Sequence, residues 1–299
     1  MKKIDAEAWS APSLTDNMPH GDMPGDKIAI NDSHIMKAGK IFKKLAAELN
    51  GLAKEKVVVS VFGGSGVGKS ETASLLAFYL QSAGVNAYVL SGDNYPRRIP
   101  MYNDAERLSI FRKEGLKGLL GSGVYCADVR KDLDELWADE TDSDPARCSD
   151  YTWLKYYQEA GRKALKAYLG TDLEQDYDEV NAIIKDFKDG KEKIFLKRMG
   201  RTEDERWYDE IDFSGVNVLI IEWTHGGNGR LQGIDIPILL NSTPEETREH
   251  RRLRARDGKT DSAFTTMVLS VEQEELDERG KYAKIIMSKG GEFIDPATF

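Results

Sequence analysis

Apolar positions along the chain follow two patterns, helical spacing and short continuous runs. Helical spacing covers residues 34–50, after a candidate N-cap at Asp32-Ser33 and before a candidate stop at Gly51. Four short apolar runs have the length of buried strands: 57–62, 87–90, 216–221 and 234–240. Buried strands that alternate with helical segments predict an α/β fold, in which helices cover both faces of a parallel sheet.

The stretch between the second and third predicted strands is more than a hundred residues long, far more than a plain crossover needs. Helical spacing returns there over 151–169 and 177–187, so we expect a structured insertion. At the other end of the chain, residues 1–31 are polar, lack periodicity and hold three of the nine prolines. This composition indicates a loosely held, flexible N-terminal arm.

A glycine-rich segment directly follows the first predicted strand and fits the pattern G-x-x-x-x-G-K-[ST]. Its members are Gly63, Gly64, Ser65, Gly66, Val67, Gly68, Lys69 and Ser70, and Glu71 comes next in the helix that follows. Such a loop turns its backbone N–H groups toward phosphate oxygens, and the helix N-terminus adds a positive dipole. We expect Lys69 to reach the β and γ phosphates of ATP and Ser70 to ligate Mg²⁺.

The second predicted strand ends in a polar segment, Ser91-Gly92-Asp93-Asn94-Tyr95-Pro96-Arg97-Arg98. Ligands of parallel sheets bind beyond the carboxyl ends of the strands. A carboxylate at Asp93 can accept the proton of a hydroxyl that attacks the γ-phosphorus, and Arg97 and Arg98 can hold an anionic acceptor. An alternative of equal weight is that Asp93 only caps the turn.

At the end of the third predicted strand, four apolar residues at 218–221 are followed by an acidic one, Glu222. This is the form of a Walker B strand. A carboxylate there supports Mg²⁺ directly or through water. His225 follows three residues later and can position the acceptor, although a structural hydrogen bond is at least as good an explanation.

A basic segment at residues 249–257 holds four arginines. Basic runs on helices usually form a solvated face. In a phosphoryl-transfer enzyme, however, arginines on a mobile segment can close over the triphosphate and stabilise charge in the transition state. We favour such a lid over about residues 248–262, because the rest of the chain is acidic.

Composition narrows the function class. The net charge is −9, which argues against a nucleic-acid binder and favours a small-molecule substrate. The two cysteines, Cys126 and Cys148, are too few for a disulfide scaffold. No apolar run is long enough to span a bilayer, and the N-terminus lacks the apolar segment of a signal peptide. We therefore expect a cytoplasmic enzyme without a membrane partner, and leave a homodimer open.

These motifs, in this order, resemble the uridine kinase and phosphoribulokinase family of P-loop kinases from about Val57 to Pro296. Asp93-Asn94-Tyr95 is similar to the family's Asp-x-Phe/Tyr, whose Asp is the catalytic base. Residues 221–226 look like a Tyr-Glu-Gly-Leu-His-Gly segment, which assigns Glu222 to the metal and acceptor region. Arg252 and Arg256 match the lid arginines.

The resemblance also implies a helix and a two-stranded flap over the acceptor, which places Tyr95, Arg198, Arg201 and His225 near it. We expect a P-loop kinase domain over residues 32–299. Its parts are a core at about 55–100 and 212–299, an acceptor-side insertion at about 101–211, and the arginine lid.

Near the expected acceptor site, the sequence departs from both phosphoribulokinases and uridine kinases. Pro96 stands where phosphoribulokinases usually have a histidine, and no uracil-binding signature is present. The arginines at 97, 98, 130, 198 and 201 together favour an anionic acceptor such as a sugar phosphate or a carboxylate-bearing metabolite, although a surface salt bridge is the better explanation for each one separately. The leading hypothesis is an ATP- and Mg²⁺-dependent kinase acting on a hydroxyl of a sugar, sugar phosphate or nucleoside. The alternative is a nucleotide-dependent regulatory switch, suggested by Asp212-Phe213-Ser214-Gly215.

Overall fold

The computed structural model describes residues 1–15, 17–254 and 262–299. Its centre is a six-stranded sheet in the order β2-β5-β1-β6-β7-β8. The strands are β1 (Val57–Gly63), β2 (Ala87–Ser91), β5 (Val218–Glu222), β6 (Ile236–Leu240), β7 (Ile285–Met287) and β8 (Phe293–Ile294). All pairs are parallel except β7 with β8. The predicted parallel α/β fold is confirmed, and every residue of β1 is buried.

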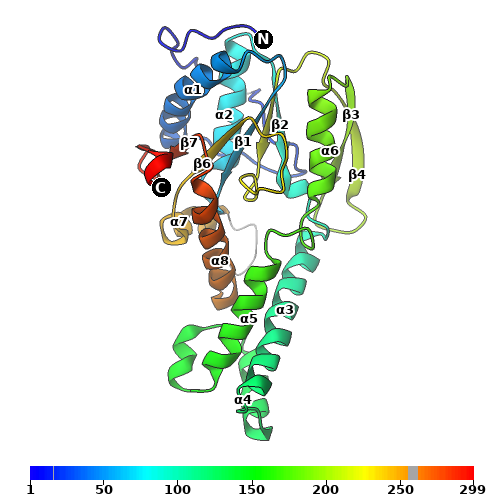
Figure 1. Cartoon of the computed structure of the whole chain (residues 1–299), viewed down its shortest axis with the longest axis vertical. Coiled ribbons are helices and arrows are strands. Elements are labelled where there is room, and N and C mark those ends of the chain that lie inside the picture. Colours follow the sequence, from blue (N-terminus) through cyan, green and yellow to red (C-terminus); the bar gives the residue numbers. More distant parts are fainter. Residues whose placement is uncertain (16, 255–261) are drawn as a thin grey trace.

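Helices cover both faces of this sheet (Figure 1). On one face, α1 (Asp32–Leu52) and α2 (Lys69–Ser82) pack on the strands in one apolar cluster. The opposite face carries α6 (Tyr177–Lys188) and a two-stranded flap of β3 (Lys193–Met199) and β4 (Arg206–Asp212). The remaining helices near the sheet are α7 (Pro244–Arg254) and α8 (Ala263–Gly280), and the short 3₁₀ turns are η1 (Gly92–Asn94), η2 (Pro145–Ser149) and η3 (Pro296–Thr298).

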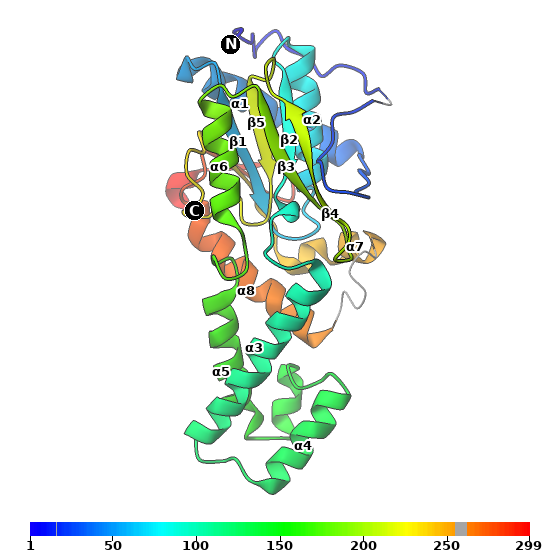
Figure 2. The same ribbon diagram turned by 90° about the vertical axis from the view of Figure 1, so that its right-hand side faces the viewer.

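The insertion forms a helical stalk that extends away from the sheet (Figure 2). It contains α3 (Pro100–Gly121), α4 (Ala127–Ala138) and α5 (Leu154–Tyr168). Glycines let α3 and α5 approach closely. A Cβ atom on Gly161 of α5 would stand 2.6 Å from the carbonyl oxygen of Phe111, and one on Gly118 of α3 would stand 2.6 Å from that of Tyr156. The two backbones therefore touch where larger side chains do not fit.

The N-terminal arm has no helix or strand among its described residues, yet it is packed on the core. Ile4 is 5% exposed, and the ring centroid of Trp9 lies 4.3 Å from that of Phe42 and 4.9 Å from that of Tyr79. Asp22 is hydrogen-bonded at the end of β2. This differs from the expected loosely held arm, because isolated apolar and acidic residues dock without any periodic pattern.

Among the described residues, no helix combines the length and the apolarity that crossing a bilayer requires.

Alanine at Gly161 is expected to lower the free energy of unfolding by about 1–3 kcal/mol, because its methyl carbon would press against the backbone of Phe111. Urea denaturation measures this change. The matched control is Gly121→Ala on α3, because a Cβ atom there would have no atom of another segment within 4 Å. It should be neutral or stabilise the protein by up to about 1 kcal/mol through helix propensity. Equal effects of the two substitutions would contradict the close contact of α3 with α5.

Candidate active site

The glycine-rich segment forms the turn between β1 and α2, as a phosphate-binding loop does. Gly66 has φ +75° and Gly68 has φ +96°. Residues other than glycine rarely adopt this left-handed backbone conformation. Gly68 is the N-cap of α2, and Lys69 begins that helix. The Lys69 Nζ donates to the carbonyl oxygen of Gly64 at 3.0 Å, so the ammonium group folds back over the loop. The helix N-terminus and this cation together favour an anion.

A buried carboxylate lies where three strands end beside this loop. Glu222 is the last residue of β5 and is 3% exposed. Its register partners are Ser91 in β2 and Val61 in β1. The Ser91 hydroxyl donates to Oε1 at 2.6 Å, and the Ser70 hydroxyl donates to Oε2 at 3.2 Å. The β5 carboxylate is thereby hydrogen-bonded to the first turn of α2 and to the end of β2.

The charges of Asp93 and Lys69 act on the pKa of this carboxyl group. Burial and then the negative charge of Asp93 raise the pKa of Glu222 to about 8, while the positive charge of Lys69 opposes the shift. Asp93 lies on η1 and is exposed, whereas its neighbour Asn94 is buried. A Cβ on Gly92 would stand 2.0 Å from the Trp223 ring, so glycine lets the turn pack against that ring.

The residues at this point fit a magnesium ion bound together with phosphates. The described residues contain no group of three or more His, Cys, Asp or Glu that could hold a metal. Mg²⁺ in nucleotide sites is held by one or two protein oxygens, with phosphate and water oxygens completing its shell. Ser70 Oγ and the Glu222 carboxylate are hard oxygen donors that lie side by side, and they would hold the ion.

Several residues expected to bind the acceptor have protein partners instead. Tyr95 is fully buried, with Lys197 Nζ 5.0 Å from its ring centre, so its ring belongs to the core under the flap. Arg97 pairs with Asp176 at 3.3 Å and also donates to the carbonyl oxygen of Asp172. Arg98 donates to the Tyr168 hydroxyl and to the carbonyl oxygen of Leu173, both at 3.1 Å.

The two flap arginines differ from each other. Arg198 has a side chain 6% exposed and pairs with Asp22 at 2.9 Å and with Asp209 at 3.0 Å. Arg201 is exposed at the β3–β4 turn, and its backbone N–H donates to Glu205. The charge of Arg198 is therefore matched by two carboxylates.

His225 lies in the interior beside a charged network. It is 4% exposed, and its Nδ1 has no hydrogen-bond partner in the described part of the chain. Burial lowers the pKa of His225 to about 3, so the ring is neutral at ordinary pH. The neighbouring Arg107 of α3 donates to Glu174 at 2.6 Å and lies 3.5 Å from Glu272 of α8. The sequence pattern gave no signal for this network, because its members come from three distant segments.

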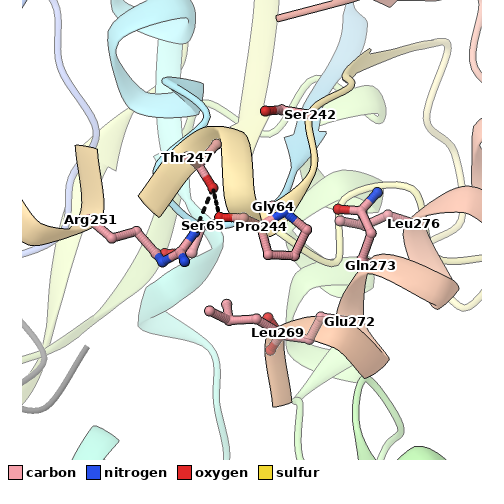
Figure 3. A pocket seen from close by; sticks show the side chains of 10 residues that line it. All are labelled: Gly64, Ser65, Ser242, Pro244, Thr247, Arg251, Leu269, Glu272, Gln273 and Leu276. Carbon is pink, nitrogen blue, oxygen red and sulfur yellow. Dashed lines mark hydrogen bonds between the residues drawn. The ribbon is translucent and has the colours of Figure 1, made fainter. Parts of the chain in front are cut away.

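The predicted lid is described only in part. Arg252 is exposed on α7, while Arg256 lies outside the described residues. Arg251 of α7 donates to the carbonyl oxygen of Pro244 and to the Thr247 hydroxyl. It lines a narrow pocket together with Gly64 and Ser65, and the opposite wall is α8 (Figure 3). The basic segment therefore begins beside the phosphate loop.

Glu272 lines that same pocket and supports a prediction about pH. Burial raises the pKa of its carboxyl from 4.5 to about 7, although Arg107 opposes the shift. Between these values the folded chain binds a proton that the unfolded chain has released, so stability falls as pH rises. Glu272→Gln should remove this contribution, up to about 1.4 kcal/mol per pH unit. Urea denaturation of both proteins from pH 4.5 to 7 measures the difference, and parallel stability curves would contradict it.

The chain is similar in sequence to part of a larger protein whose name includes a kinase. No family model matches the sequence. The chain is 36% identical over 259 residues, which is 87% of its length, to the bifunctional alpha-galactosidase/sucrose kinase AgaSK of Mediterraneibacter gnavus. The match spans 23% of that larger protein.

The solved structures that this chain matches are distant from it in sequence. D-glycerate 3-kinase from Cryptococcus neoformans var. grubii serotype A is 12% identical with a TM-score of 0.48, over 89% of this chain and 99% of that one. A possible uridine kinase from Bacillus stearothermophilus is 13% identical with a TM-score of 0.40, over 84% and 96%. The fold is identified from the strand order and from the phosphate loop of this chain. The chain has the predicted α/β fold, a mostly parallel sheet with a glycine-rich loop between β1 and α2.

Proposed function

We propose that the chain is an ATP- and Mg²⁺-dependent kinase that phosphorylates a hydroxyl group of an uncharged carbohydrate. The observation that carries this proposal is the buried carboxyl group of Glu222 at the carboxyl edge of the sheet, which accepts from Ser70 at the start of α2 and from Ser91 at the end of β2, and whose pKa is raised by Asp93 and lowered by Lys69. One cation, one buried carboxylate and one exposed carboxylate beside a phosphate loop are the groups that phosphoryl transfer to an alcohol needs.

Each of these groups has a role in the proposed reaction. The backbone N–H groups of the loop and Lys69 bind the phosphates. Ser70 and Glu222 would hold Mg²⁺, which neutralises phosphate charge when bound. Asp93, at the exposed face of η1, accepts the proton of the acceptor hydroxyl as its oxygen attacks the γ-phosphorus. Arg252 and Arg256 are proposed to close over the triphosphate as parts of a lid.

The charge balance around η1 supports an uncharged acceptor rather than the anionic one that the arginines suggested. Arg97 and Arg198 pair with carboxylates, and Arg98 donates to a hydroxyl and a carbonyl. Arg107 likewise serves Glu174 and Glu272. An anion that bound to these arginines would have to displace their partners, whereas an uncharged sugar would not. The relative AgaSK is named as a bifunctional alpha-galactosidase/sucrose kinase, which supports the same class of acceptor.

The regulatory switch has less support from the structure. Its Asp-x-x-Gly motif would have to follow a strand at the nucleotide edge. Asp212 instead ends β4 of the flap, and its side chain accepts from the backbone N–H of Ser214 in the turn before β5. Phe213 is fully buried in the core. The segment therefore serves as a structural turn.

Acceptor-dependent ADP release should appear with ATP, Mg²⁺ and neutral mono- or disaccharides, and be much weaker with sugar phosphates. The screen covers sugars, sugar phosphates, nucleosides and polyols, with Lys69→Ala as the blank because it removes the phosphate-binding cation. Stimulation by sugar phosphates alone would contradict the uncharged acceptor. No stimulation by any class, with nucleotide still bound, would favour the switch.

Asp93→Asn should leave the affinity for ATP within about twofold and reduce turnover by about 10²-fold or more, because an amide cannot accept the hydroxyl proton. Steady-state kinetics with the best acceptor, together with calorimetric ATP titration, measure the two effects. Asp128→Asn, exposed on the first turn of α4, is the matched control and should match the wild type. Turnover at the wild-type rate in the Asp93 variant would exclude it as the base.

A further inference from the structure

A short strap of the N-terminal arm, residues 19–22, crosses the carboxyl edge of the sheet. At one end, the Ser74 hydroxyl of α2 donates to the carbonyl oxygen of Pro19. In the middle, a Cβ on Gly21 would lie 3.4 Å from Glu222 Oε1 and 3.6 Å from the Cβ of Ser91. The strap backbone therefore lies against the two residues that join β5 to β2.

At the other end of the strap, Asp22 binds donors from three elements. Its Oδ1 accepts from the backbone N–H of Ser91 at 2.8 Å and from the Asn94 side-chain amide at 3.0 Å. Its Oδ2 accepts from the Tyr88 hydroxyl at 3.0 Å and from Arg198 at 2.9 Å. The side chain is 8% exposed. Four donors fill the capacity of one carboxylate, so its oxygens are satisfied although burial raises the pKa of the group.

The donors of Asp22 surround the proposed base. Ser91 and Asn94 stand on either side of Asp93 in the chain, and both are held by the same carboxylate oxygen. The Asn94 side chain also accepts from the backbone N–H of Met199 at 3.0 Å, which ties the turn to the flap. The Asp93 backbone is thus held from the strap, from β2 and from β3.

We propose that Asp22 is a positioning residue for phosphoryl transfer, which acts by holding the η1 turn and with it Asp93. This inference rests on the proposed function, in which Asp93 is the base. It assigns a role in the reaction to a segment outside the P-loop core. The competing explanation is that Asp22 only tethers the arm to the core. The two differ in whether the loss of Asp22 acts through Asp93.

The first test compares Asp22→Ala with a control in the same arm. The control is Asp5→Ala. Asp5 is exposed, and its side chain accepts from the nearby backbone N–H groups of Glu7 and Ala8. Asp22→Ala should reduce kcat with the acceptor by about 10- to 100-fold, because small misplacements of a reacting group cost that much. The KM for ATP should stay within about twofold, and Asp5→Ala should match the wild type. Wild-type kcat in Asp22→Ala would overturn the proposal.

The conservative variant Asp22→Asn keeps one oxygen that can accept from Ser91 and Asn94, but loses the charge that faces Arg198. It should recover most of the turnover that alanine removes. This variant also serves as the test if Asp22→Ala does not fold, as judged by circular dichroism. A loss in Asp22→Asn as large as in Asp93→Asn would overturn positioning through the η1 hydrogen bonds.

A double-mutant cycle separates positioning from tethering. On the Asp93→Asn background, Asp22→Ala should lower the residual turnover by less than twofold, because the base that it positions is already absent. A multiplicative loss would show that Asp22 acts independently of Asp93, and would overturn the proposal.

Hydrogen exchange gives a readout that does not depend on catalysis. The amides of Ser91 and Met199 should exchange at least about tenfold faster in Asp22→Ala than in Asp5→Ala, because the first loses its acceptor and the second loses its ordered partner. If the wild type transfers no phosphoryl group to any acceptor, the proposed function fails, and exchange still decides whether Asp22 orders the turn. Unchanged exchange would overturn that ordering even in an active enzyme.

Discussion

The site depends on one buried carboxylate, that of Glu222. It is held by hydroxyl groups of Ser70 and Ser91, which belong to the start of α2 and the end of β2. Burying a carboxyl group is costly unless its oxygens are hydrogen-bonded. Because its donors come from two other elements, the carboxylate is satisfied only when β5, β2 and the phosphate loop are in register. The interaction that would support the metal also fixes the edge at which the acceptor must approach.

The acceptor side is organised by charge pairs that satisfy one another. Arg107 of the stalk joins Glu174 to Glu272, and Arg198 of the flap joins Asp22 to Asp209. Glu174 is fully buried, so removing Arg107 would leave its charge unpaired in the interior, which costs about 3–5 kcal/mol. The stalk, the flap, the arm and α8 are therefore held in place by polar contacts as well as by apolar ones. An acceptor that carries its own charge would have to compete with these pairs.

The position of the phosphate loop in the fold could be predicted from the sequence, whereas the contacts behind η1 could not. The phosphate loop is a local pattern, and its glycines, Lys69 and Ser70 lie within one turn, so spacing alone places them. Glu222 follows an apolar strand for the same reason. Asp22 pairs with Arg198, 176 residues away, and Arg107 pairs with Glu174, 67 residues away; no local pattern reports such pairs. Arg198 and Tyr95 were expected to face the acceptor, but burial and long-range partners hold them inside.

This difference has a physical cause that bears on specificity. Phosphate is recognised by backbone N–H groups and a helix dipole, which depend on chain conformation and therefore on a few glycines. A sugar is recognised by side-chain hydroxyl, amide and carboxyl groups, whose directions depend on what packs behind them. Here the groups behind η1 come from the arm and the flap, through Asp22 and Met199. In the proposed reaction, we therefore expect the arm and the flap, rather than the P-loop core, to determine which acceptor binds.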